Sequence, residues 1–130
     1  MKIYIITIFP ELFEPFINGG LIKKAVENNS MEFVLLNPRD FTEDKHRKVD
    51  DEPFGTGRGM VMKVEPIVNA FESIPEKIRD EALVLMPSPR GKILKQSNLN
   101  RWKELPVIIF ICGRYKDIDA RVLKLTNARE

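Results

Sequence analysis

The stretch VIIFICGRY, at residues 107–115, decides how the chain folds. Residues 107–112 are apolar throughout, which is typical of a strand that is buried on both faces of a parallel sheet. Gly113 follows at once and ends this strand. Ligands of open parallel sheets bind outside the carboxyl ends of the strands. The turn that contains Cys112, Gly113, Arg114 and Tyr115 is therefore a candidate binding loop.

The segments on the amino-terminal and carboxyl-terminal sides of this strand extend the pattern. Further strands are predicted at residues 3–8, 31–36 and 82–86, and helices at residues 11–16, 21–26, 64–74, 94–102 and 118–125. Strands that alternate with helices need crossover connections. We therefore predict an α/β fold with a mainly parallel sheet and helices on both faces. The chain has 130 residues and no linker or internal repeat, which suits one domain.

Composition indicates a globular protein of a reducing compartment. Hydrophobic residues make up 43% of the chain and charged residues 31%, a balance typical of soluble domains. No apolar run reaches the roughly 18 residues that a membrane span needs, so we expect no membrane association. Cys112 is the only cysteine, which excludes an internal disulfide and leads us to expect a cytoplasmic protein.

The net charge of +2, from 21 basic and 19 acidic residues, is too small to hold a nucleic acid by bulk charge alone. Several basic residues could nevertheless contact phosphates. They are Arg39, Lys45, Arg47, Lys48 and Arg58. Because acidic neighbours offset their charge on average, RNA binding would depend on a local arrangement of these side chains or on residues shared between chains.

A second candidate loop follows the predicted strand at residues 82–86. It contains Met86, Pro87, Ser88, Pro89, Arg90 and Gly91. The prolines restrict the backbone, and Gly91 allows a turn or a close approach to a ligand. Together with the loop at Gly113, it could read the edges of an adenine or a ribose. The alternative is that both are ordinary turns at strand ends.

A glycine-rich segment, GTGRG at residues 55–59, follows the acidic run of Asp50, Asp51 and Glu52. It lacks the G-x-G-x-x-G spacing of dinucleotide-binding loops and the Lys-Ser/Thr pair of phosphate-binding loops. Glycines at this density favour a loop that lies against a flat surface. The acidic run admits three interpretations, as acid catalysts, metal ligands or a solvated charge run, and the solvated run is the default.

Neither His46 nor Cys112 predicts a metal or nucleophilic site. His46 is the only histidine, and its neighbours Lys45 and Arg47 favour contact with water or phosphate. No Cys/His cluster supports a zinc site, so no metal is predicted. Cys112 ends an apolar strand without an identifiable basic neighbour, which favours a packing role.

Several short motifs occur in order over nearly the whole chain. They are Thr7-Ile8-Phe9-Pro10-Glu11-Leu12-Phe13, Pro38-Arg39-Asp40-Phe41-Thr42, Asp44-Lys45-His46-Arg47, Val49-Asp50-Asp51, Pro53-Phe54-Gly55, Gly57, Gly59-Met60-Val61-Met62, Ser88-Pro89, Gly91, Cys112-Gly113-Arg114-Tyr115, Ile118-Asp119 and Arg121-Val122. In this order and at this spacing they resemble the bacterial tRNA (guanine-37-N1)-methyltransferases.

The resemblance implies a knotted, Rossmann-like methyltransferase domain of the SPOUT type, a rare exception to unthreaded chains. It also implies S-adenosylmethionine as methyl donor, N1 of guanosine 37 in tRNA as acceptor, and a homodimer whose active sites use both subunits. By the same resemblance, the cofactor would contact Met86, Pro87, Ser88, Pro89, Gly91, Gly113, Arg114 and Tyr115. The target guanine would lie near Asp50, Gly55, Gly57, Arg58 and Gly59.

Departures from the family pattern occur near both expected sites. Thr56 replaces a glycine of the glycine-rich loop, and Arg58 replaces a small residue or proline. Lys116-Asp117 stands where the family has Glu-Gly, which reverses one charge.

Chains of the resembled family are also much longer than this one. We expect residues 1–130 to form an incomplete, amino-terminal cofactor-binding domain that stops before the knot closes and lacks the tRNA-binding domain. We therefore assign no catalytic residue and expect no methyl transfer from this chain alone. The alternative is a truncated, non-catalytic relative that dimerises or binds RNA or ligand.

Overall fold

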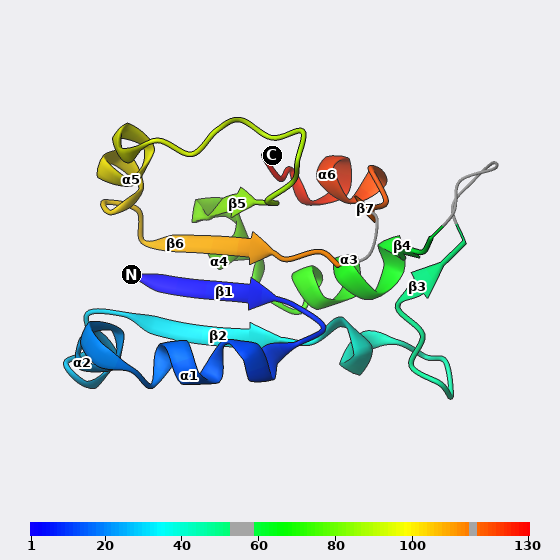
Figure 1. Cartoon of the computed structure of the whole chain (residues 1–130), viewed down its shortest axis with the longest axis horizontal. Coiled ribbons are helices and arrows are strands. Elements are labelled where there is room, and N and C mark those ends of the chain that lie inside the picture. Colours follow the sequence, from blue (N-terminus) through cyan, green and yellow to red (C-terminus); the bar gives the residue numbers. More distant parts are fainter. Residues whose placement is uncertain (53–58, 115–116) are drawn as a thin grey trace.

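Four parallel strands form the main sheet of the computed structural model (Figure 1), which describes residues 1–52, 59–114 and 117–130. In spatial order the strands are β2 (Glu32–Leu36), β1 (Lys2–Ile6), β6 (Val107–Ile111) and β5 (Leu83–Leu85). All three neighbouring pairs run parallel. The predicted mainly parallel sheet is therefore confirmed, with its most apolar strands at the centre.

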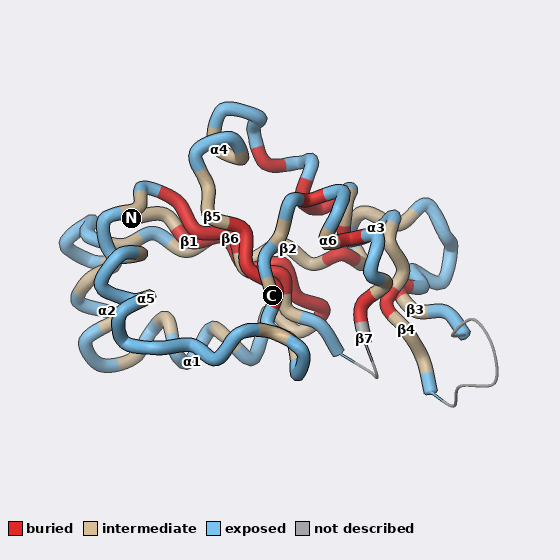
Figure 2. The backbone as a smooth tube through the Cα atoms, turned by 90° about the horizontal axis from the view of Figure 1, so that it is seen from above, coloured by how far each residue is buried: buried red, intermediate tan, exposed pale blue. Residues whose placement is uncertain are grey.

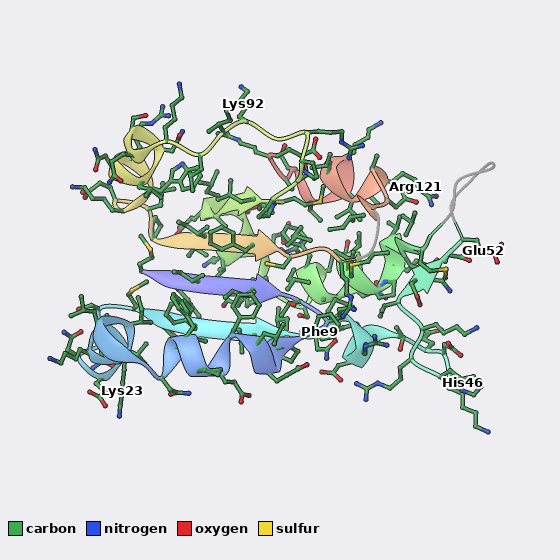
Figure 3. The ribbon with its side chains drawn as sticks, in the orientation of Figure 1. Phe9, Lys23, His46, Glu52, Lys92 and Arg121 are labelled. Carbon is green, nitrogen blue, oxygen red and sulfur yellow. The ribbon has the colours of Figure 1, made fainter. Side chains whose placement is uncertain are left out.

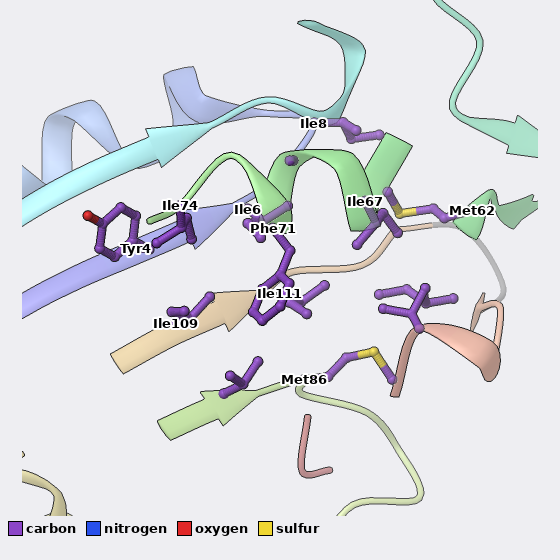
Figure 4. Packing of buried hydrophobic residues seen from close by; sticks show 14 of the residues in the cluster. Tyr4, Ile6, Ile8, Met62, Ile67, Phe71, Ile74, Met86, Ile109 and Ile111 are labelled. Carbon is purple, nitrogen blue, oxygen red and sulfur yellow. The ribbon is translucent and has the colours of Figure 1, made fainter. Parts of the chain in front are cut away.

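Side chains of the central strands alternate between two buried faces of this sheet. Tyr4 and Ile6 of β1 pack with Ile109 of β6 in one hydrophobic cluster (Figure 4). Phe71, from α3 (Val64–Glu72), closes the same cluster. Because both faces are buried, residues 3–6 of β1 are apolar and do not alternate with polar residues, and the one charged residue, Lys2, stands at the start of the strand.

Helices cover both faces of the sheet, as predicted. The remaining helices are α1 (Glu14–Ile17), α2 (Gly20–Glu27), α4 (Glu76–Glu81), α5 (Gln96–Trp102) and α6 (Arg121–Thr126), with 3₁₀ turns η1 (Pro10–Leu12) and η2 (Pro38–Phe41). Figure 2 shows α3 and α4 on one side of the sheet and α1, α2 and α5 on the other. On the second side, Phe16 of α1 meets Phe33 of β2 edge-on, with ring centroids 6.4 Å apart.

A second, smaller sheet lies beyond the carboxyl ends of the main strands (Figure 1). It consists of β3 (Asp50–Asp51), β4 (Val61–Met62) and β7 (Asp117–Ile118). β3 pairs with β4 antiparallel, and β4 pairs with β7 in parallel. The sequence did not predict this sheet, because strands of two residues show no measurable alternation.

The predicted helix at residues 118–125 is wrong at its start. Ile118 is buried in β7 opposite Met62, and α6 begins only at Arg121. Asp119 causes the delay, because its carboxylate accepts a hydrogen bond from the backbone N–H of Arg121 at 3.0 Å. A side chain that accepts the N–H two residues on stabilises a turn that competes with a helix.

Proline also shortens the helix predicted at residues 64–74. The helix ends at Glu72, and Pro75 precedes a separate helix, α4, that the sequence analysis did not predict. Proline cannot continue a helix and disfavours helical geometry in the residue before it. The predicted helix at residues 94–102 begins two residues late, at Gln96.

Candidate functional site

Both predicted binding loops follow the carboxyl ends of strands in the main sheet. We call this end of the sheet its carboxyl edge. β5 and β6 are neighbouring parallel strands, with Leu85 opposite Phe110, so the turns that follow them emerge side by side. Figure 1 shows this edge together with η2 and the small sheet. The structure thus brings the loop from Met86 to Gly91 and the turn at Gly113 into one region, as the sequence predicted.

Contacts from the last residues of the chain shape the loop after β5. Met86 is buried, and its backbone N–H donates to the carbonyl oxygen of Arg129 at 2.9 Å. A Cβ on Gly91 would lie 2.8 Å from the carbonyl carbon of Glu130, so this position requires glycine. The Arg90 guanidinium also forms a 3.3 Å ion pair with Glu130. The loop is therefore ordered by a segment that lies far from it in sequence.

Electrostatics at this contact favour the ionised form of Glu130. A hydrogen bond from Ser88 lowers the pKa of the Glu130 carboxyl, and the neighbouring Arg90 lowers it further. The hydroxyl of Ser88 also accepts the backbone N–H of Arg90 at 3.2 Å. Ser88 thus connects the loop to the end of the chain.

A hollow of about 950 Å³ opens beside this loop, at the upper end of the size range of small-molecule sites. Four of the predicted cofactor residues line it, namely Met86, Pro87, Ser88 and Gly91. Pro89, Gly113 and Arg114 are not among its lining residues. Among the described residues of the two predicted binding loops, those that line the hollow all belong to the loop after β5.

Residues that the sequence analysis did not assign to the site form the rest of this hollow. Asn98 and Trp102 of α5 line it, together with Leu83 and Phe110 of the sheet. No spacing or motif signal joins these positions, since they come together only in the folded chain.

The turn after β6 is held by packing. A Cβ on Gly113 would lie 2.8 Å from side-chain atoms of Ile118, so a larger residue would collide with this buried side chain. The backbone N–H of Arg114 donates to the sulfur of Met62 at 3.3 Å. The Arg114 guanidinium lies over the ring of Phe9, 4.5 Å from its centroid. Tyr115 lies outside the described residues.

Phe9 therefore joins the site, although the sequence analysis assigned it no role beyond its motif. It follows β1 directly, and Figure 3 shows it at the same edge of the sheet. A guanidinium stacked on an aromatic face is attracted by the ring quadrupole. The loops after β1 and β6 are thus joined by one side-chain contact.

Of the described residues that were predicted to face the guanine, Asp50 belongs to the small sheet and Gly59 lies two residues before its strand β4. Asp50 is half-buried in β3 and pairs with Met62 of β4. Gly59 is exposed and has a φ of 106°, a conformation that favours glycine. Gly55, Gly57 and Arg58 lie outside the described residues. Since Met62 also contacts Arg114, β4 links the Asp50 region to the turn after β6.

The chemistry of the acidic run and of Cys112 is limited. Asp51 and Glu52 are exposed, as expected for a solvated charge run. Within the described ranges, no group of three or more His, Cys, Asp or Glu side chains could hold a metal ion. Burial raises the pKa of the Cys112 thiol, which disfavours the nucleophilic thiolate. None of the helices in the described ranges has the length and apolar character to cross a bilayer.

Comparison with known proteins gives a consistent result. The sequence profile of the family described as tRNA (Guanine-1)-methyltransferase TrmD matches residues 1–130. A tRNA (guanine-N(1)-)-methyltransferase of Nostoc punctiforme is 48% identical over 98% of this chain and 53% of its own length. The corresponding enzyme of Carboxydothermus hydrogenoformans is 44% identical over 96% of this chain and 48% of its own length.

The fold is also similar to a solved structure. The crystal structure of tRNA (m1G37) methyltransferase from Aquifex aeolicus superposes with a TM-score of 0.86 at 33% sequence identity. The match covers 96% of this chain and 56% of that chain. This chain thus spans about half the length of the relatives that it matches.

Proposed function

Because the chain belongs to the tRNA (guanine-1)-methyltransferase family, we propose that it serves methyl transfer from S-adenosylmethionine to N1 of guanosine 37 in tRNA. Family membership confirms the resemblance inferred from the ordered motifs. The activity itself is a proposal for this chain, which spans about half of its relatives' length.

One observation carries the proposal, namely that two glycine-containing loops leave adjacent parallel strands at one edge. In the first loop, Gly91 is packed so closely that a Cβ would collide with the backbone. In the second, Gly113 is packed against buried Ile118. Such rigid turns can present backbone N–H and carbonyl groups to an adenosyl group without reorganisation. We propose that both loops contact the cofactor, including Pro89 and Tyr115.

In the proposed reaction, the sulfonium–methyl bond of S-adenosylmethionine breaks while a bond forms between that carbon and N1 of guanine. The proton on N1 must leave to a base, and donors on guanine O6 would stabilise the developing charge. We assign no base within this chain. Its own residues position the two reactants. Asp50 and the glycine-rich segment shape the part of the site that holds the guanine, and the loops after β5 and β6 shape the part that holds the cofactor.

We further propose that the chain forms a SPOUT-type cofactor-binding domain that acts as a homodimer in the cytoplasm. Large apolar side chains at the outer surface of η1, α1 and α2 support an interface. Leu12 is 69% exposed, Phe16 56% and Leu21 81%. The single cysteine of the sequence supports a reducing compartment.

A chimaera tests the proposed activity directly. In it, residues 1–130 replace the matching part of the Nostoc punctiforme enzyme, and transfer of labelled methyl to a tRNA transcript is measured. We expect methylation of a transcript with guanosine at position 37 and none when adenosine replaces it.

The alternative function, a non-catalytic relative that binds RNA or ligand, predicts a different result. A folded chimaera that binds the transcript but transfers no methyl would refute the proposed enzyme. Unaltered activity of the parent Nostoc enzyme in the same assay is the control.

A further inference from the structure

Several exposed basic side chains lie on one short segment near the carboxyl ends of the main strands. We call residues 39–48, which begin within η2 and end just before β3, the basic hairpin. Reciprocal hydrogen bonds close it: Nε of Arg47 donates to the carbonyl oxygen of Arg39 at 3.1 Å, and Nη1 of Arg39 donates to that of Arg47 at 3.4 Å. The Arg47 guanidinium also pairs with the Asp40 carboxylate. The hairpin therefore has a defined shape despite its exposure.

Asp44 fixes the tip of the basic hairpin. Its carboxylate oxygens accept the backbone N–H groups of His46 at 3.2 Å and Lys48 at 3.1 Å. These hydrogen bonds lower the pKa of Asp44, so the carboxylate is ionised at neutral pH. The backbone of Arg47 is left-handed, with a φ of 51°. Asp40 and Asp44 are thus both engaged within the hairpin.

Three charged side chains of the basic hairpin take no part in these contacts and are exposed, namely Glu43, Lys45 and Lys48. Lys45, His46 and Lys48 are exposed, and within the described part of the chain none of them forms an ion pair within 4.0 Å. Figure 3 shows His46 at the same end of the molecule as Glu52 and opposite to Lys23. Because Asp40 and Asp44 are engaged within the segment, Lys45 and Lys48 keep no internal carboxylate partner among the described residues, although the exposed Glu43 lies between the two engaged acids.

This surface adjoins the region proposed to face the guanine. Lys48 precedes Asp50 by two residues, so their Cα atoms are at most about 7 Å apart. A polynucleotide has a phosphate at every nucleotide. An RNA with one base beside Asp50 must therefore place neighbouring phosphates near this edge. Lysine is a compact point charge that suits phosphate contacts without base discrimination.

We propose that the basic hairpin binds the sugar–phosphate backbone of the RNA substrate through Lys45 and Lys48, with Asp44 and Arg47 holding its shape. The proposal rests on the proposed function, because that function makes RNA the partner.

The test measures binding of the whole 130-residue chain to a fluorescent tRNA transcript across a series of salt concentrations. The variant is Lys45→Gln with Lys48→Gln. Its matched control is Lys23→Gln with Lys24→Gln, which removes the same charge from α2 at the opposite end of the molecule. All four lysines are exposed, so the folded state should tolerate both pairs.

We expect the hairpin variant to bind about tenfold more weakly, since two charge contacts are lost. The slope of log affinity against log salt should fall by about 2, or about 1 per lysine. The control pair should leave both quantities close to those of the unmodified chain. Absence of tRNA binding by the unmodified chain, or equal effects of the two pairs, would overturn the proposal.

The chimaera keeps failure of this proposal separate from failure of the proposed function. A chimaera that methylates guanosine 37 equally well with and without Lys45 and Lys48, at tRNA concentrations below saturation, would exclude the basic hairpin and retain the enzyme. If the unmodified chimaera transfers no methyl but still binds tRNA through Lys45 and Lys48, the proposed enzyme activity would be excluded and the proposed role of the basic hairpin retained.

Discussion

Single side chains at the carboxyl edge act through defined contacts, and Asp44 gives the sharpest case. Its pKa lies below the usual value of 3.8, chiefly because the backbone N–H groups of His46 and Lys48 donate to its carboxylate. A carboxyl whose pKa is lowered by folding stabilises the folded form above its unfolded pKa. That contribution is lost as the pH falls through the folded pKa.

We therefore predict that the basic hairpin loosens in acid below about pH 4. The measurement is the amide resonance of Lys48 and its hydrogen exchange, followed by NMR as the pH is lowered. Asp44→Asn is the control, because it keeps an acceptor oxygen but does not titrate. An identical pH response in Asp44→Asn would show that another group is responsible.

Phe9 and Arg114 provide a second residue-scale prediction. Replacing Phe9 by Leu removes the aromatic face beneath the guanidinium, and a contact of this kind is worth about 0.5–1 kcal/mol at an exposed site. The Nε–H resonance of Arg114 should lose its ring-current shift, and the chain should unfold at lower denaturant concentration. Phe9→Tyr should preserve both properties. An unchanged Arg114 resonance in Phe9→Leu would show that the contact is not formed in solution.

At the scale of elements, the turn between β6 and β7 depends on the absence of a side chain at Gly113. A Cβ there would lie 2.8 Å from atoms of the Ile118 side chain. We predict that Gly113→Ala costs about 1–3 kcal/mol of unfolding free energy, as overpacking usually does. The same substitution in an Ile118→Ala background should cost less, because the colliding atoms are gone. Equal costs in a double-mutant cycle would exclude the steric explanation.

The elements also show how far the sequence could be interpreted. Long apolar runs predicted all four main strands, because β6 and residues 3–6 of β1 lie in the core and are apolar throughout. The small sheet was missed, since Asp50 and Val61 belong to strands of two residues whose pairing is tertiary. Ile118 was assigned to a helix for the same reason: its apolar character serves β7, and nothing local distinguishes the two roles.

The candidate site divides in the same way. Motifs predicted the loops at Ser88 and Gly113, and strand order placed them at one edge. Neither the motifs nor the strand order predicted that Trp102 lines the hollow or that Phe9 lies beneath Arg114. Both contacts join segments far apart in sequence, and they depend on how α5 and the turn after β1 pack.

At the scale of the whole molecule, stability depends on the core between the sheet and α3. Ile109 is fully buried at its centre, so Ile109→Ala should cost about 2–5 kcal/mol. Leu125, which is 58% exposed on α6, is the matched control, and Leu125→Ala should change stability by less than about 0.5 kcal/mol. Urea unfolding of both variants measures this difference. Similar losses would show that the core is not where the structure places it.

The position of β1 between β2 and β6 has a consequence for biosynthesis. Lys2 pairs with Val107, so the second edge of β1 stays unpaired until residues 107–111 have been synthesised. At usual ribosomal speeds this interval lasts on the order of five to twenty seconds. During that time the nascent chain exposes the unpaired backbone groups of an apolar strand, and such an edge can pair with other chains and cause aggregation. We therefore expect the yield of this protein in cells to depend on translation rate and on chaperone supply.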